Sequence, residues 1–95
     1  MTNILPEGLV NYSQTPVFTA QNVPEKLTSV HNTKAGLWGK LVVITGGVDY
    51  FIPSQSESPA HLQKGDIGII EPGVDHYVRL SDDASFKVEF YKRQS

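Results

Sequence analysis

The sequence predicts an all-β protein built as a two-sheet barrel, with no helix longer than a turn or two. Short apolar runs recur along the chain, and glycine, proline, asparagine or aspartate separates them. No stretch keeps apolar residues at the i, i+3, i+4, i+7 spacing of an amphipathic helix. Strands and turns that alternate at such short intervals are typical of small sandwiches and barrels.

The length predicts one domain over residues 1–95, because two separate cores and a linker would leave each half too small to be stable. A chain of this size buries only about two-thirds of the surface that it exposes when unfolded. Burial against a second copy would add to that, so we expect a homodimer.

The first segment, through Thr19, contains Pro6 and Pro16, which cannot donate to a strand ladder. This predicts an edge strand or an extended arm, with residues 1–11 as an N-terminal arm that could cover a neighbour's sheet edge. A second strand-like segment covers residues 26–31.

The central apolar run covers residues 38–45 and ends at Gly46 and Gly47. Its density of apolar residues predicts a strand covered on both sides, and the two glycines predict a hairpin turn. The partner strand of that hairpin would be residues 48–52.

Residues 53–61 are rich in serine and proline and lack a hydrophobic period, which predicts an exposed, flexible loop. A strand follows at residues 67–71, and residues 72–75 form a turn into the next strand, residues 76–80. The last strand, residues 86–91, alternates apolar and charged residues as a half-buried strand does.

His76 is the first candidate for chemistry. Alternation places it on one face with Val78 and Leu80, opposite Tyr77 and Arg79, so it points into the barrel if the apolar face is the interior. Two interpretations are open: a ligand-binding imidazole, or a buried histidine satisfied by one hydrogen bond to a backbone carbonyl.

Two further histidines carry weaker signals. His31 ends a segment without clear alternation and precedes residues of loop composition, so by itself it fits an ordinary surface position. His61 lies beside the serine-rich loop and is expected to be solvated.

A carboxylate at Glu89 would complete a His31, His76 and carboxylate site suited to zinc, iron or manganese. Alternation argues against it. With Val88 and Phe90 facing the core, Glu89 faces outward unless a bulge reverses the register.

Lys40 lies within the central apolar run and shares a face with Trp38. Such a lysine needs a carboxylate partner, a bound anion or a route by which its amine reaches water. Trp38, Tyr50 and Tyr77 are candidates to line a pocket, although aromatic residues in a small β domain also serve as core packing.

Composition excludes several classes of function. The chain has no cysteine, so a thiolate metal site, a disulfide and a thiol nucleophile are all absent, and any metal must use nitrogen and oxygen ligands. Its net charge of -2, with scattered basic residues, disfavours nucleic-acid binding. No run approaches the ~20 apolar residues of a membrane span, and no leader pattern is present, so we expect a cytoplasmic protein without membrane association.

Two blocks resemble the small cupin-like domain of the tellurite-resistance protein B family: residues 31–41, HNTKAGLWGKL, and residues 72–78, PGVDHYV. The resemblance extends from about Tyr12 to Tyr91. It implies a cupin-type double-stranded β-helix, or jelly-roll barrel, and a loose association with tellurite resistance. Some members carry a methyltransferase that uses S-adenosylmethionine after this domain, and we expect the present chain to be the stand-alone form without it.

The usual cupin metal site needs a His-x-His pair, which this sequence lacks. What the resemblance implies is His76 as the histidine of the second cupin motif, with His31 as its partner.

Three functions therefore compete. The first is binding of a small molecule or oxyanion inside the barrel by His31, His76 and Lys40, with Trp38 and Tyr50 as walls. The second is a metal-dependent cupin enzyme with a divalent ion such as zinc. The third is a structural or regulatory dimer without a ligand.

Overall fold

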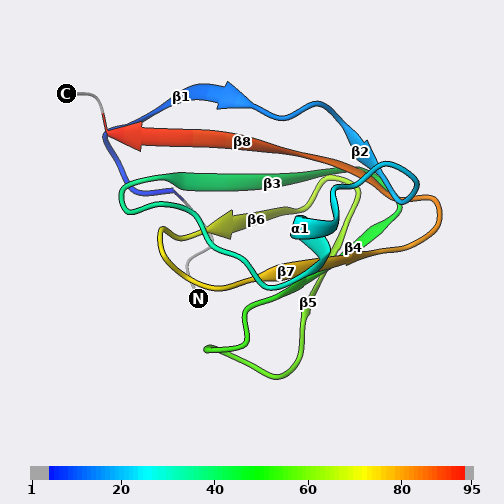
Figure 1. Cartoon of the computed structure of the whole chain (residues 1–95). Helices are drawn as coiled ribbons and strands as arrows, with labels where there is room; N and C mark the ends of the chain where they lie inside the picture. Colours follow the sequence, from blue (N-terminus) through cyan, green and yellow to red (C-terminus); the bar gives the residue numbers. More distant parts are fainter. Residues whose placement is uncertain (1–4, 94–95) are drawn as a thin grey trace.

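The computed structural model of the chain describes residues 5–93 and consists mainly of antiparallel strands (Figure 1). The elements, in chain order, are β1 (Leu9–Gln14), β2 (Phe18–Thr19), α1 (Glu25–Thr28), β3 (Trp38–Thr45), β4 (Gly47–Phe51), β5 (Ala60–Gln63), β6 (Ile67–Ile70), β7 (Tyr77–Leu80) and β8 (Ser85–Arg93). The mostly-β class is confirmed, and α1 is a single helical turn.

The strands form two antiparallel sheets. One has the order β1-β8-β3-β6, with β2 also paired to β8, and the other has the order β5-β4-β7. Figure 1 shows them as two layers, with α1 beside β7. Between residues 5 and 93 no strand pairing links the two sheets, so a closed barrel is not seen.

The core lies between the sheets and is filled by alternate residues of the facing strands. Its most buried members are Leu41, Val43, Val48 and Phe86. On β3 the residues of the other face, such as Trp38 and Val42, are only partly buried, and Ile44 is exposed. The expectation that residues 38–45 are covered on both sides is therefore wrong, because only one face of this sheet packs on the core.

The expected hairpin between β3 and β4 is also wrong, since the two strands belong to different sheets. Gly46 turns the chain from one sheet to the other with a φ of 65°. A Cβ at Gly46 would lie 2.7 Å from the backbone nitrogen and Cα of Ala84. Gly46 thus allows the chain to turn from one sheet into the other. A two-residue hairpin would have kept both strands in the same sheet.

The segment expected as a strand at residues 26–31 begins with α1 instead. The hydroxyls of Thr28 and Ser29 donate to the Glu25 carbonyl oxygen at 2.9 and 3.2 Å, which satisfies the backbone locally and competes with a ladder. Leu27 packs against the core. A short apolar run cannot be assigned to helix or strand from its periodicity alone.

Residues 53–59 form the expected irregular loop, but its last two predicted residues belong to β5, which sequence reasoning missed. Leu62 is the one buried residue of this strand, so its apolar pattern is too short to recognise. His61 is exposed on β5, and its Nδ1 lies 2.6 Å from Asp49 Oδ1. The flexibility of the loop stays a prediction.

Residues 1–4 of the expected N-terminal arm lie outside the described residues. From Leu9 the chain forms β1, which pairs with β8 and lies at the edge of its sheet, as Pro6 and Pro16 on either side of it predict. Within residues 5–93, no helix combines the length and the apolar character that crossing a membrane requires.

Candidate functional site

The two candidate histidines lie side by side. The N–H of His31 donates to the His76 carbonyl oxygen at 3.0 Å, and the N–H of His76 donates to the His31 carbonyl oxygen at 2.8 Å. This isolated antiparallel bridge joins the segment after α1 to the start of β7. The ring centroids are 4.3 Å apart, with an angle of 60° between the ring planes.

Both imidazoles are oriented through the same ring nitrogen. Nδ1 of His31 lies 2.9 Å from the Ser29 carbonyl oxygen, and Nδ1 of His76 lies 2.9 Å from the Val74 carbonyl oxygen. Since a carbonyl can only accept, each Nδ1 carries the proton. In the neutral ring, Nε2 then holds a lone pair, and in the charged ring it becomes a second donor. The hydrogen bond to a carbonyl and a binding role for Nε2 are therefore compatible.

The environment of His76 disfavours its charged form. The residue is 3% exposed. Burial is the largest effect and lowers the pKa of His76, and the neighbouring His31 lowers it further. The hydrogen bond to Val74 and the charge of Asp75 raise the pKa, but the net result is a pKa below the ordinary value. A ligand that placed a negative charge beside the ring would favour the charged form.

Tyr50 supports His76 from the core. Its ring is edge-on to the His76 imidazole at 5.8 Å between centroids, and its hydroxyl donates to the Ile69 carbonyl oxygen at 3.0 Å. Burial and the charge of Glu71 raise the pKa of Tyr50. Tyr50 is therefore neutral, and its hydroxyl proton is used in the hydrogen bond to Ile69. The residue packs against His76 and is not among the residues that line the pocket.

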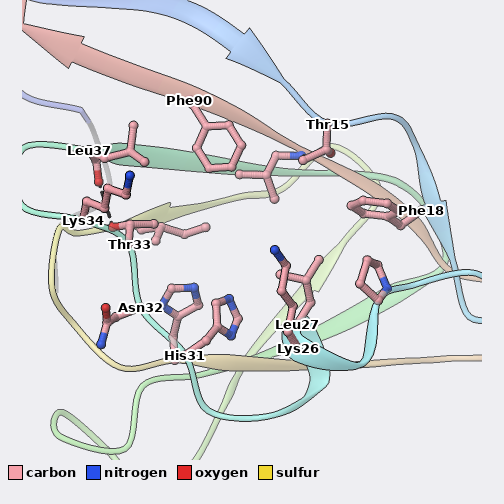
Figure 2. A pocket seen from close by; sticks show the side chains of 14 residues that line it. Thr15, Phe18, Lys26, Leu27, His31, Asn32, Thr33, Lys34, Leu37 and Phe90 are labelled. Atoms are coloured by element: carbon pink, nitrogen blue, oxygen red, sulfur yellow. Dashed lines mark hydrogen bonds between the residues drawn. The ribbon is translucent and has the colours of Figure 1, made fainter.

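A pocket of about 500 Å³ opens beside the two histidines (Figure 2). Its lining residues are Thr15, Phe18, Pro24, Lys26, Leu27, His31, Asn32, Thr33, Lys34, Leu37, Ile70, His76, Val88 and Phe90. Figure 2 shows Phe90 on β8 across the pocket from His31, and Lys26 extending from α1 toward the same space.

The titratable side chains of this lining are lysines and histidines. Lys26 and Lys34 contribute ammonium groups, and no aspartate or glutamate is among the lining residues. Neither lysine has an ion pair within 4 Å among residues 5–93. Asp75, directly before His76, is not among the lining residues, and its Oδ1 accepts from Asn32 Nδ2 at 2.8 Å.

The structure does not bring Lys40 or Glu89 to the histidines. The two residues are cross-strand partners on β3 and β8, and Lys40 Nζ lies 3.9 Å from Glu89 Oε1. Lys87 Nζ lies 3.2 Å from Glu89 Oε2, and the Tyr91 hydroxyl donates to Oε1 at 2.9 Å. Of the three ways to accommodate Lys40, the carboxylate partner is the one observed, and the expectation that this lysine lies near the histidines is wrong.

Glu89 faces outward, as alternation predicts, because Val88 and Phe90 on either side of it line the pocket. Burial alone would raise the pKa of Glu89, but hydrogen bonds from Tyr91 and Lys87, with the charges of Lys87 and Lys40, outweigh it and leave the pKa below its ordinary value. The carboxylate is an ion-pair partner on the outer face.

Trp38 lines a second, neighbouring hollow together with Tyr12 and Lys92, and Lys34 lines both this hollow and the pocket at the histidines. Trp38 and Tyr50 therefore do not form walls of the pocket at the histidines, although both were candidates for that role.

The residues present do not fit the metal site of a cupin enzyme. In the part of the chain that the structure describes, no three His, Asp or Glu side chains are grouped so as to hold a metal ion. His31 and His76 meet, but the third ligand required alongside them, Glu89, is held on the outer face of the sheet.

Sequence reasoning missed most of the polar lining. Asn32, Thr33 and Lys34 directly follow His31 in the block that carries the family resemblance. The block could therefore have pointed to these three residues as well as to His31. Lys26 had no such signal, because its segment was expected to be a strand.

Comparison with known proteins supports the resemblance. The family model for the TehB-like domain matches residues 13–88. The chain is 35% identical over 88 residues to the probable S-adenosyl-L-methionine-dependent methyltransferase TehB of Haemophilus influenzae (strain ATCC 51907 / DSM 11121 / KW20 / Rd), covering 87% of this chain and 31% of that protein. It thus spans about a third of the length of this relative.

Solved structures agree with the sequence comparison. The crystal structure of TehB from Haemophilus influenzae superposes with a TM-score of 0.82 at 32% identity, over 92% of this chain and 32% of that one. A protein from Escherichia coli (strain K12) superposes with a TM-score of 0.83 at 22% identity, over 97% and 98% of the two chains, which shows a shared fold. Because the family model matches most of the chain, one conclusion follows: this chain belongs to the TehB-like domain family.

Proposed function

We propose that this domain binds a small anion in the pocket beside His31 and His76. The observation that carries the proposal is the composition of the lining: two lysines and two histidines, with no aspartate or glutamate. Charges interact more strongly next to low-dielectric walls than in water, so such a pocket favours a negative ligand. Its volume of about 500 Å³ lies in the range of small-molecule sites, about 300–1,000 Å³.

Binding of an oxyanion or a carboxylate is favoured over a metal-dependent reaction, because the grouped third ligand is missing between residues 5 and 93. The methyl transfer named for TehB is not part of the proposal, since the match covers 31% of that protein. We further propose that the two sheets form the cupin-type jelly roll of the resemblance, with the pocket at its open end.

The proposal predicts that anions bind and that the pocket lysines strengthen the binding. Calorimetry would compare the wild type with a Lys26→Gln, Lys34→Gln double variant, using tellurite, phosphate and phenylacetate as probes. We expect at least one probe to bind and the double variant to weaken it about tenfold or more, since each hydrogen bond to a charged group contributes about 1.5–3 kcal/mol.

Lys64→Gln is the matched control, because Lys64 is exposed in the turn before β6 and does not line the pocket. It should leave the affinity unchanged. If none of the probes binds to the wild type, or if Lys64→Gln weakens binding as much as the double variant does, the anion pocket is rejected.

A further inference from the structure

We propose that the ligand of this pocket is an amphipathic organic acid, a carboxylate attached to a compact apolar body, and not a bare inorganic oxyanion. This inference rests on the proposed anion site and adds the class of ligand. It is carried by the division of the pocket into two chemically different walls.

The polar wall comes mainly from one segment of the chain. Residues 26–34 supply Lys26, His31 and Lys34, together with the apolar Leu27, and His76 lies directly before β7. The orientation of the imidazoles, with each Nδ1 proton donated to a backbone carbonyl, leaves Nε2 as the ring nitrogen for a ligand. A carboxylate can accept from the lysines and from a protonated Nε2 together.

The opposite wall is apolar. It consists of Phe18 on β2, Ile70 on β6, and Val88 and Phe90 on β8. Thr15 is the polar residue on this side, and its hydroxyl is already used: it donates to the Pro16 carbonyl oxygen at 2.8 Å and accepts from the Val88 N–H at 3.0 Å. This wall therefore offers an anion no free hydrogen-bond donor.

An inorganic oxyanion is hydrated on all sides, and one side of it would face these phenyl rings and aliphatic groups without compensation. Such an ion would also fill only a small part of a pocket of about 500 Å³. Water would occupy the rest, in contact with apolar side chains, which is unfavourable. A ligand with an apolar body avoids both costs, because its body covers the apolar wall while its carboxylate meets the polar wall. The pocket thus fits the two ends of one amphipathic molecule.

The test compares phenylacetate and hexanoate with two partial probes: acetate, which keeps the carboxylate without the body, and phenylacetamide, which keeps the body without the charge. Calorimetry of the full chain at about pH 6, near the ordinary histidine pKa, would measure all four together with inorganic phosphate and tellurite. We expect phenylacetate or hexanoate to bind at least tenfold tighter than acetate, phosphate and phenylacetamide.

Each unfavourable result has a separate meaning. If acetate or phosphate binds as tightly as phenylacetate and hexanoate, the amphipathic ligand is overturned and the anion site remains. If phenylacetamide binds as tightly as phenylacetate, charge is not recognised and both proposals fail. If neither carboxylate binds but tellurite does, the pocket takes inorganic oxyanions and the inference is wrong.

A substitution in the apolar wall tests the position of the body. Phe90→Ala should weaken phenylacetate at least fivefold and leave acetate unaffected, because it removes apolar contact without touching a charge. Phe51→Ala is the matched control, since Phe51 stacks on Tyr77 at a centroid distance of 4.4 Å and does not line the pocket. Phe90→Leu serves if Phe90→Ala fails to fold. Equal weakening of phenylacetate and acetate by the Phe90 variant would contradict the proposed placement.

Discussion

At the scale of single residues, the chemistry of the pocket depends on how His31 and His76 are held. Their backbones exchange two hydrogen bonds, and their Nδ1 atoms each bond to a carbonyl two residues earlier. This leaves little rotational freedom to the rings. The same contacts that satisfy the buried His76 also fix the position of its Nε2, which is the nitrogen that the proposed function assigns to the ligand.

The depressed pKa of His76 predicts a pH-dependent stability. Because the unfolded chain binds a proton with an ordinary pKa of about 6.5 and the folded chain binds it less readily, the contribution of His76 is complete above about pH 6.5. It is lost as the pH falls from there toward the lower folded pKa. Thermal unfolding followed by circular dichroism should show the melting temperature falling over this interval.

His76→Asn is the comparison, because an asparagine amide can still donate to the Val74 carbonyl oxygen but does not titrate. The slope of the melting temperature below about pH 6.5 should be smaller in this variant. An identical slope in both proteins would show that other groups carry the pH dependence.

At the scale of elements, the site depends on the corner at Gly46 and on the segment that follows β2. The corner sends β3 and β4 into different sheets. The segment containing α1 and residues 29–37 then supplies most of the polar wall of the pocket. A chain that formed a simple hairpin at this position would bring β3 and β4 into one layer and would lose the space between the sheets.

Gly46→Ala should lower the free energy of unfolding by about 3 kcal/mol. A left-handed backbone costs a residue with a Cβ about 1–2 kcal/mol, and overpacking adds about 1–3 kcal/mol. The added Cβ would meet Ala84 backbone atoms at 2.7 Å. Urea unfolding measures the change.

Gly65→Ala separates the two contributions, because Gly65 has a φ of 90° but a Cβ added there would meet no atom within 4 Å. It should cost only the conformational part, about 1–2 kcal/mol. If the two variants lose the same stability, the close approach at the corner is not important for the fold.

At the scale of the whole molecule, we expect a homodimer formed through the open edge of β1. Among the described strands, β1 is an edge strand, and its Val10 and Tyr12 are 38% and 47% exposed. An unpaired edge with exposed apolar side chains favours pairing with another chain. Since β1 already pairs with β8 of its own chain, we expect a second copy to pair with the free edge of β1 and not to exchange this strand.

Sedimentation velocity at micromolar concentration tests this expectation. Val10→Lys should produce monomers, because a lysine on an edge strand opposes edge-to-edge pairing. Val30→Lys, at a position 57% exposed outside the strands, should leave the dimer intact. A monomeric wild type would rule out the homodimer.

Alternation along the last strand was enough to place its residues. Charged and apolar side chains alternate from Phe86 to Phe90, so the outward position of Glu89 could be predicted from the sequence. On β3 both faces carry apolar residues, Trp38 and Val42 on one and Leu41 and Val43 on the other. Alternation separated the two faces of β3 but could not say which one was inside, and Lys40 was therefore assigned to the wrong side.

By itself, the sequence determined the β-rich class and the positions of most strands and turns, because these depend on local periodicity and turn chemistry. It also singled out His31 and His76, because they lie in the two blocks that carry the family resemblance. Only the tertiary structure decided which strands share a sheet, that residues 25–28 form a helical turn, and that Lys26 and Lys34 join His31 and His76 around one pocket. These depend on hydrogen bonds and packing between segments far apart in the chain. Such contacts are selected by the burial of the whole core, and no short stretch of sequence encodes them.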